Sequence, residues 1–300
     1  MDELIRKSNL MEDGNPARYR LKSTTDNLNQ SKSYRKITFG ERDTKKPHKI
    51  ILMVGETGSG KTTLINTMIN YICGVQREDK VWFEITDDQS DRSSVHSQTS
   101  DVIIYGVYLQ ETSVDLTIID TPGYGDTRGA ERDREIAESL LCLCTTEGVM
   151  NQINAVCFVM KADQNRLTDR QQYIFDAVQS LFGKDIAENI VLLFTHSKGY
   201  PPKNALTAVK EAKVKCAVDE KKNQPIYFLF DNCQGETFDE EEQTIQDQSW
   251  DLSYKGMTEF FKFLDMTQPK TLEEKKSFPS LVKLCKLWIQ MFHPHLNTQI

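Results

Sequence analysis

Long hydrophobic runs are missing from this sequence. The longest strongly apolar stretch, residues 155–160, is far too short to span a bilayer. The segment Met1-Asp-Glu-Leu-Ile-Arg-Lys7 also lacks the apolar core of a secretion signal. We therefore expect a cytoplasmic protein, and a hydrophobic content of 38% is enough for a soluble globular domain with a real core.

Paired cysteines are missing as well. The chain has seven cysteines, and no two of them stand in a Cys-x-x-Cys arrangement. Most of them lie within apolar helix or strand patterns, so we interpret them as buried thiols in a reducing compartment. This pattern argues against zinc ligands and against a disulfide framework.

Positive charge is scarce in the body of the chain. The net charge is −7, although residues 1–49 and 270–300 each carry more Lys and Arg than Asp and Glu. The residues between these two ends are therefore strongly acidic, and such a surface does not attract the phosphates of a nucleic acid. We expect no nucleic acid among the partners of this protein.

What the sequence does contain is a phosphate-loop motif. The apolar run Lys49-Ile-Ile-Leu-Met-Val54 leads directly into Gly55-Glu-Thr-Gly-Ser-Gly-Lys-Thr62, which fits the pattern G-x-x-x-x-G-K-[ST]. Apolar residues at helical spacing follow the loop, for example Leu64 and Met68. Backbone N–H groups of such a loop and the N-terminus of the next helix bind phosphate together. An ordinary glycine-rich turn is the alternative, and the strand before the loop and the helix after it argue against it.

A second motif predicts a metal site beside the loop. The apolar strand at residues 114–119 ends in Asp120-Thr-Pro-Gly123. In a phosphate-loop protein an Asp at this place holds Mg²⁺ through a bound water, and the hydroxyl of Thr62 is a direct metal ligand. Lys61 would reach the phosphates, and Gly123 could offer its N–H to a γ-phosphate. Both motifs follow the carboxyl ends of predicted strands, where ligands bind in open α/β sheets.

A further metal ligand is expected in the polar stretch before the strand at residues 102–109. Ser97 and Thr99 are the candidates, and we prefer Thr99 because it lies closest to that strand. An ordinary mobile loop rich in Ser and Thr is an equally good interpretation of either residue.

These motifs resemble a known family. The segment Asp120-Thr-Pro-Gly-Tyr-Gly-Asp126, following the phosphate loop, resembles the septin and immunity-associated (GIMAP-type) branch of the translation-factor-class GTPases. The segments Arg166-Leu-Thr168, Leu181-Phe-Gly183 and Ile190-Val-Leu-Leu-Phe-Thr-His196 are similar to the GIMAP-type pattern. The similarity covers about residues 48–265.

We expect an α/β fold, namely a three-layer phosphate-loop GTPase domain with a mostly parallel central sheet at residues 47–268. The short connection within residues 102–119 predicts one β-hairpin at the edge of that sheet. Residues 1–46 show no sustained periodicity and predict a mostly disordered polar leader. Residues 269–300 predict a helical tail, whose amphipathic stretch at 278–292 packs on the domain or meets a partner or a membrane surface.

Three sets of site residues follow from the motifs and the resemblance. The nucleotide is expected to contact Gly55, Glu56, Thr57, Gly58, Ser59, Gly60, Lys61, Thr62, Thr63, Thr195, His196 and Asn232. The expected ligands of Mg²⁺, directly or through water, are Thr62, Thr99 and Asp120. The expected catalytic groups are Lys61, Thr99 and Gly123. The ligand implied by the resemblance is GTP or GDP.

Base recognition departs from the family pattern. GIMAP-like relatives often have Thr-x-x-Asp where this chain has Thr195-His-Ser-Lys198, and the Asp accepts two guanine hydrogens. A lysine cannot accept hydrogen bonds. The segment Phe230-Asp-Asn-Cys233 resembles the loop on the other side of the base, and His196 or Asp231 could compensate for the missing carboxylate.

Catalysis departs from the pattern too. Ras-like switches place a Gln after the glycine of the Asp-x-x-Gly motif, and this chain has Tyr124 there. We therefore expect slow GTP hydrolysis that is helped by a homodimer through the nucleotide face, with Arg92 or Arg128 acting across it. Two alternatives stay open, a nucleotide-dependent scaffold that does not hydrolyse and, with weaker support, an enzyme that uses ATP.

Overall fold

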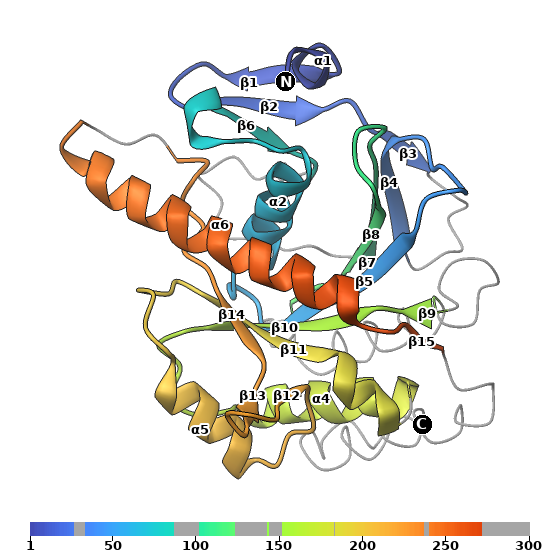
Figure 1. Ribbon diagram of the computed structural model, residues 1–300, viewed down its shortest axis with the longest axis vertical. Coiled ribbons are helices and arrows are strands. Elements are labelled where there is room, and N and C mark those ends of the chain that lie inside the picture. Colours follow the sequence, from blue (N-terminus) through green and yellow to red (C-terminus); the bar gives the residue numbers. More distant parts are fainter. Residues whose placement is uncertain are drawn as a thin grey trace, which may run out of the picture.

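The structure is a computed structural model that describes residues 1–26, 34–86, 102–123, 143, 152–182, 184–236 and 240–271. Its centre is an eight-stranded sheet with the strand order β14-β11-β10-β5-β8-β7-β4-β3 (Figure 1). In chain order these strands are β3 (Thr24–Asp26), β4 (Tyr34–Gly40), β5 (His48–Gly55), β7 (Val102–Tyr108), β8 (Asp115–Asp120), β10 (Ala155–Lys161), β11 (Ile190–Thr195) and β14 (Tyr227–Leu229).

The sheet is mostly parallel, as the sequence predicts. Strands β14, β11, β10, β5 and β8 pair in parallel. Strand β7 is antiparallel to β8 and forms the predicted hairpin with it. The position of the hairpin was predicted wrongly, because β4 pairs with β7 and β3 pairs with β4, so the hairpin lies inside the sheet.

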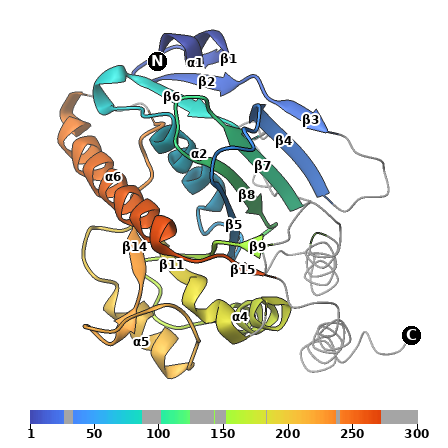
Figure 2. The ribbon, with the colours of Figure 1, turned by 45° about the vertical axis from the view of Figure 1, so that its right-hand side comes forward.

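Helices cover both faces of the sheet and give the predicted three layers (Figure 2). Helices α2 (Lys61–Ile72) and α6 (Gln243–Met266) lie on one face, and α4 (Asp169–Phe182) and α5 (Lys203–Glu211) lie on the other. Side chains of β5 alternate between the two cores, with Ile51 and Met53 in the first and Leu52 and Val54 in the second. A strand that is buried on both faces reads as a continuous apolar run, and this is why β5 stands out in the sequence.

Short elements complete the chain. A second sheet has the order β1-β2-β6. Its strands and the remaining elements are α1 (Asp2–Arg6), β1 (Ser8–Glu12), β2 (Ala17–Leu21), η1 (Arg77–Asp79), β6 (Val81–Glu84), β9 (Gln152–Ile153), η2 (Lys184–Asn189), β12 (Val218–Asp219), β13 (Gln224–Pro225), η3 (Glu240–Glu242) and β15 (Lys270–Thr271).

The prediction of a mostly disordered leader is wrong for residues 1–26 and 34–46. Strand β4 joins the central sheet along its whole length, and Tyr34, Ile37 and Phe39 are buried. Polar residues separate these three side chains, so the segment shows no clear periodicity by itself. Its stability comes from pairing with β7, which lies more than sixty residues later in the chain. Residues 27–33 lie outside the described part.

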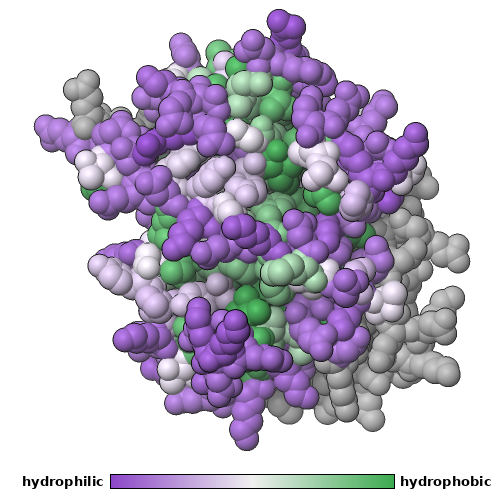
Figure 3. Space-filling view, viewed as in Figure 1, coloured by the Kyte–Doolittle hydropathy of each residue, from purple (hydrophilic) through white to green (hydrophobic). Residues whose placement is uncertain are grey.

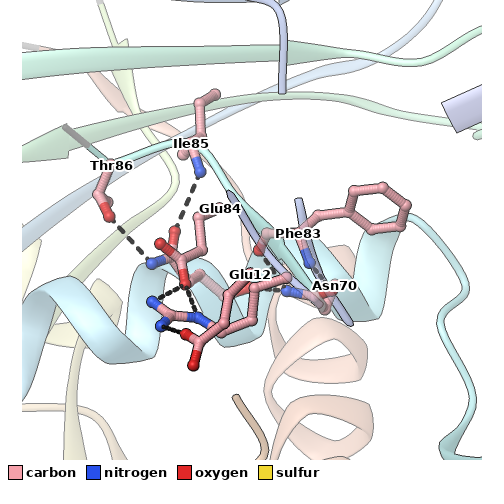
Figure 4. A network of polar contacts seen from close by, with 8 residues as sticks. Glu12, Asn70, Phe83, Glu84, Ile85 and Thr86 are labelled. Carbon is pink, nitrogen blue, oxygen red and sulfur yellow. Dashed lines mark hydrogen bonds and ion pairs between the residues drawn. The ribbon is translucent and has the colours of Figure 1, made fainter. Parts of the chain in front are cut away.

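The hairpin of β1 and β2 is attached to β6, which is held in turn by the helix of the phosphate loop (Figure 4). Strand β2 pairs in parallel with β6, and Arg18 Nε donates to the buried Glu84 at 2.8 Å. On the other edge of β6, Asn70 of α2 exchanges two hydrogen bonds with the backbone of Phe83, at 2.7 and 2.9 Å. Asn66 accepts from the N–H of Ile85 at 3.2 Å. The N-terminal hairpin is therefore connected to the phosphate loop through one strand and one helix.

The end of the described chain forms a small two-stranded sheet, which is separate from the central sheet. After α6, strand β15 pairs antiparallel with β9, so the ordered domain continues past the predicted limit at residue 268. The predicted tail helix at residues 278–292 lies outside the described part. On the face shown in Figure 3, most of the surface is hydrophilic, and hydrophobic side chains show mainly in the hollows between elements. Within the described ranges, no helix is both long and apolar enough to cross a membrane.

Candidate functional site

The phosphate loop connects β5 to α2, and its glycines adopt the backbone shape that the motif requires. Gly58 and Gly60 have φ angles of +74° and +86°, in the left-handed region that other residues rarely adopt. The N–H of Ser59 donates to the carbonyl of Glu56 at 3.2 Å and closes the turn. Helix α2 then begins at Lys61 with Gly60 as its N-cap, so the free N–H groups of its first turn face the loop.

Lys61 is a buried cation held at the centre of the loop. Its side chain is only 7% exposed, and Nζ donates to the carbonyls of Gly55 at 2.9 Å and Glu56 at 3.1 Å. Burial lowers the pKa of Lys61, and the carboxylates of Asp120 and Glu56 act in the opposite direction. An ammonium group has three donors. Two of them are used within the loop, which leaves the third for a ligand such as a phosphate oxygen.

Asp120 lies at the end of β8, beside β5, and is 1% exposed. Its Oδ1 atom has no hydrogen-bond partner among the described residues. Burial raises the pKa of Asp120 to about 7, and the nearby Lys61 opposes that rise. A buried carboxylate oxygen without a partner is costly, so this atom fits a site that is completed by a cation or by its bound water. Thr62, half-buried on the first turn of α2, supplies a second oxygen of the kind that Mg²⁺ prefers.

Gly123 approaches the phosphate loop closely. A Cβ atom at this position would lie 2.4 Å from Oγ1 and 2.6 Å from Cα of Thr57, so no larger residue fits there. The hydroxyl of Thr121, two residues earlier, donates to the carbonyl of Met53 at 2.9 Å and fixes the path of this segment. The two phosphate motifs, which lie far apart in the sequence, therefore meet in space.

Thr195, the last residue of β11, supports the phosphate loop. Its hydroxyl donates to the carbonyl of Ser59 at 2.7 Å, and the side chain is buried. His196, the next residue, has a φ angle of +51° and is exposed. Lys198 is exposed as well. The structure thus places Thr195 under the loop and leaves His196 and Lys198 at the surface beside it.

The segment Phe230-Asp-Asn-Cys233, which is expected on the other side of the base, lies next to Thr195-His-Ser-Lys198. The contact between them is a hydrogen bond that the N–H of Ser197 donates to the carbonyl of Phe230 at 3.0 Å. One oxygen of the Asp231 carboxylate, Oδ2, accepts from Ser249 Oγ of α6 at 2.6 Å. That Asp231 replaces the missing carboxylate stays a prediction. Asn232 differs, because its Nδ2 atom is buried and has no partner within the described ranges.

Sequence reasoning missed the two serines of α6 that shape this loop. Ser253 Oγ accepts from the N–H of Asp231 at 2.9 Å and contacts Asn232 Oδ1 at 3.2 Å. Ser249 and Ser253 stand four residues apart, so they share one face of the helix. Two serines on an otherwise apolar helix face are the sequence feature from which this contact could have been predicted.

Glu56 is placed differently from its neighbours. Its carboxylate turns toward the start of α4, where Oε1 accepts from Thr168 Oγ1 at 2.8 Å and Oε2 accepts from Gln171 Nε2 at 3.1 Å. The sequence analysis assigned Glu56 to the nucleotide, which stays a prediction, and in the structure its side chain contacts the start of α4. Of the other expected residues, Thr57 and Thr63 are exposed at the loop, while Thr99, Tyr124, Arg92 and Arg128 lie outside the described part.

Comparisons with known proteins agree with this geometry. The model of the AIG1 family matches residues 49–249. Immune-associated nucleotide-binding protein 7 of Arabidopsis thaliana is 28% identical over 145 residues, which are 48% of this chain and 40% of that protein. The septin homolog spn1 of Schizosaccharomyces pombe is 32% identical over 76 residues, which are 25% of this chain and 15% of that protein. The chain spans less than half the length of the curated relatives it matches.

A solved structure matches the fold. It is a dimerisation-deficient mutant of Toc33 from Arabidopsis thaliana, with a TM-score of 0.50 and 15% identity, and the match covers 76% of this chain and 88% of that one. At this identity the likeness establishes the fold alone, and it agrees with the mostly parallel sheet and the helices on its two faces.

Proposed function

The chain belongs to the AIG1 family, within the septin-like and GIMAP-like branch of the P-loop GTPases, and from this premise we propose that it binds GTP and GDP with Mg²⁺, hydrolyses GTP slowly and self-associates through its nucleotide face. The observation that carries the proposal is the incomplete polar centre of the phosphate loop. Lys61 has a donor left for an anion, and Asp120 has a buried oxygen left for a cation or its water. A nucleotide phosphate with Mg²⁺ satisfies both.

The residues of the loop would divide the work as follows. Lys61 would neutralise charge on the β- and γ-phosphates, and the N–H groups of the loop and of the first turn of α2 would bind their oxygens. Thr62 and Asp120 would hold Mg²⁺, which supplies charge neutralisation on the phosphates when it is bound. Gly123, in contact with Thr57, would offer its N–H to the γ-phosphate.

Guanine selectivity rests on the family and on one atom of the site. Asn232 Nδ2 is a buried donor without a partner among the described residues, and the O6 atom of guanine is an acceptor. Adenine has a donor at the corresponding position, so the same amide group favours guanine. Lys198 contributes no acceptor for the guanine N1 and N2 hydrogens.

Slow hydrolysis follows from Tyr124, which offers no amide to orient the attacking water. Assistance would then come from a second copy of the chain, with Arg92 or Arg128 as the group that stabilises the transition state. The structural neighbour described above is a dimerisation-deficient mutant of Toc33. A scaffold that binds GTP without hydrolysis is the second candidate, and Tyr124 favours it.

Equilibrium binding of labelled GTP, GDP and ATP with and without Mg²⁺ tests the first part of the proposal. We expect GTP and GDP to bind more tightly than ATP, and Mg²⁺ to tighten GTP. Equal binding of ATP would favour an ATP-using enzyme, and no binding of any of the three would refute the proposed function.

Turnover on the same sample tests the second part. A monomer should hydrolyse GTP no faster than on the order of 10⁻³ s⁻¹, which is the rate of an unassisted switch. Turnover per molecule should rise with protein concentration, and Arg92→Ala or Arg128→Ala should abolish that rise if either residue assists. No turnover at any concentration would favour the scaffold, and fast turnover by a monomer in light scattering would contradict the dimer model.

A further inference from the structure

The carboxylate of Glu56 leaves the phosphate loop and binds the first turn of α4. Its two oxygens accept hydrogen bonds from two different side chains, Thr168 Oγ1 at 2.8 Å and Gln171 Nε2 at 3.1 Å. These residues lie more than one hundred positions away in the sequence. Both carboxylate oxygens therefore accept from residues outside the phosphate loop.

The partners of Glu56 are held in place by the helix cap. Thr168 Oγ1 accepts from the N–H of Gln171 at 3.2 Å, and Gln171 Oε1 accepts from the N–H of Thr168 at 3.0 Å. These two reciprocal hydrogen bonds form a Thr-x-x-Gln capping box at the start of α4. Gln171 is only 2% exposed and also donates to Gln164 at 3.1 Å. The cap therefore positions the two side chains that donate to Glu56, independently of Glu56 itself. The N-terminus of α4 also favours a negative charge at this place.

The backbone of Glu56 carries the effect to the phosphate side of the loop. Its carbonyl accepts from Lys61 Nζ at 3.1 Å and from the N–H of Ser59 at 3.2 Å. The residue that binds α4 with its side chain therefore positions the lysine and closes the glycine turn with its backbone. A shift of the carboxylate would move both contacts.

We propose that Glu56 is a positioning residue that fixes the phosphate loop to the cap of α4 and so sets the place of Lys61, without touching the nucleotide. The nucleotide measurements below rest on the proposed function, and the hydrogen-exchange measurement rests on the contacts of Glu56 alone. Because coupling between two sites is reciprocal, nucleotide binding would also stabilise residues 163–168, which lead into α4.

The first test separates this connection from simple helix capping. Thr168→Asp keeps a good N-cap residue but places a second carboxylate against Glu56, and Glu56→Gln combined with Thr168→Asp restores a donor and an acceptor. Thr207→Asp, at an exposed position of α5, controls for the added charge. We expect amide hydrogen exchange at Ser59 in the nucleotide-free protein to rise about tenfold in Thr168→Asp and to return toward wild type in the double variant.

The second test measures GTP and GDP affinity in the same four proteins, together with thermal unfolding. Thr168→Asp should weaken both nucleotides by about tenfold, and the double variant should recover to within about threefold of wild type. Thr207→Asp should match wild type, and the unfolding temperatures should stay close together. Recovery in the double variant is a result that a merely structural role would not produce.

Three outcomes would count against the proposal or its premise. If Thr168→Asp behaves like Thr207→Asp in exchange and in affinity, Glu56 does not act through α4. If the double variant binds GTP and GDP more weakly than Thr168→Asp, Glu56 contacts the ligand itself. If the wild type binds neither nucleotide, the proposed function fails, and the exchange experiment alone then decides whether the connection exists.

Discussion

The phosphate loop and the N-terminal segment are attached to the same domain by different forces. The loop is held by a few polar contacts, which Thr195, Glu56 and Lys61 make with backbone or side-chain partners. The N-terminal segment is held by strand pairing and by buried apolar side chains, among them Ile37 and Phe39. Substitutions in the two regions should therefore change different properties. Loss of apolar burial in the N-terminal segment should lower stability, and loss of a polar contact in the loop should change ligand binding.

The largest effect is expected in the N-terminal segment. Phe39→Ala should lower the free energy of unfolding by about 3–5 kcal/mol, because the ring is 4% exposed in the core beneath β4. Lys36→Ala, on a half-exposed position of the same strand, should change it by no more than about 0.5 kcal/mol. Urea unfolding of both variants measures this. A loss below about 1 kcal/mol for Phe39→Ala would mean that β4 is not an integral strand of the sheet.

The next effect belongs to the phosphate loop. Lys61→Ala should weaken GTP and GDP by about a hundredfold or more, because a charge-assisted contact to phosphate is lost from a dry site. Stability should change little, because the hydrogen bonds that Lys61 makes to described residues all go to carbonyls of the loop. Lys210→Ala, exposed on α5, is the matched control. Nucleotide titrations and circular dichroism on both variants check the contrast, and unchanged affinity in Lys61→Ala would remove the phosphate-site assignment.

A smaller effect is expected at Lys198, where a substitution should raise nucleotide affinity without changing stability. Lys198→Asp should tighten GTP and GDP relative to ATP by about one to two decades, because it supplies the acceptor that the family pattern has there. The residue is exposed, so stability should stay near wild type. Competition binding of the three nucleotides measures the ratio. A ratio equal to that of wild type would assign base recognition to His196 and Asn232.

The smallest effect concerns pH, at the end of the sheet opposite the loop. Burial lowers the pKa of His48 to about 4, Arg42 and Lys36 act in the same direction, and Asp115 opposes them. In the unfolded chain this pKa is about 6.5. The neutral ring therefore contributes fully above pH 6.5, and its contribution is lost as the pH falls from about 6.5 to about 4.

After allowance for screening by solvent, this loss should be about 1–2 kcal/mol. His48→Gln keeps a polar group near Thr117, whose hydroxyl lies 2.8 Å from His48 Nε2, and removes the titration. Urea unfolding of both proteins between pH 7 and about 4.5 isolates the histidine, because the carboxylates are common to both. Parallel pH profiles would contradict the assignment.

The parts that could be predicted from the sequence are those set by neighbours along the chain. Strand β5 and helix α2 were predicted from the apolar run before the phosphate loop and from the helical spacing of Leu64 and Met68 after it. Strand β4 could not be predicted, because its partner β7 lies far away in the sequence. For the same reason the contact between Glu56 and α4 could not be predicted from the sequence. The nucleotide and metal contacts themselves stay predictions.

Two asparagines of α2 protect one edge of strand β6 from pairing with a strand of another molecule. Asn66 and Asn70 are one helical turn apart, about 6 Å along the axis, which matches the rise of about 6.6 Å between alternate residues of a strand. Their side chains therefore satisfy Phe83 and Ile85 as a neighbouring strand would. Strand β6 has its second edge closed by a helix, so it offers no open template on which another chain could add a strand and begin an aggregate.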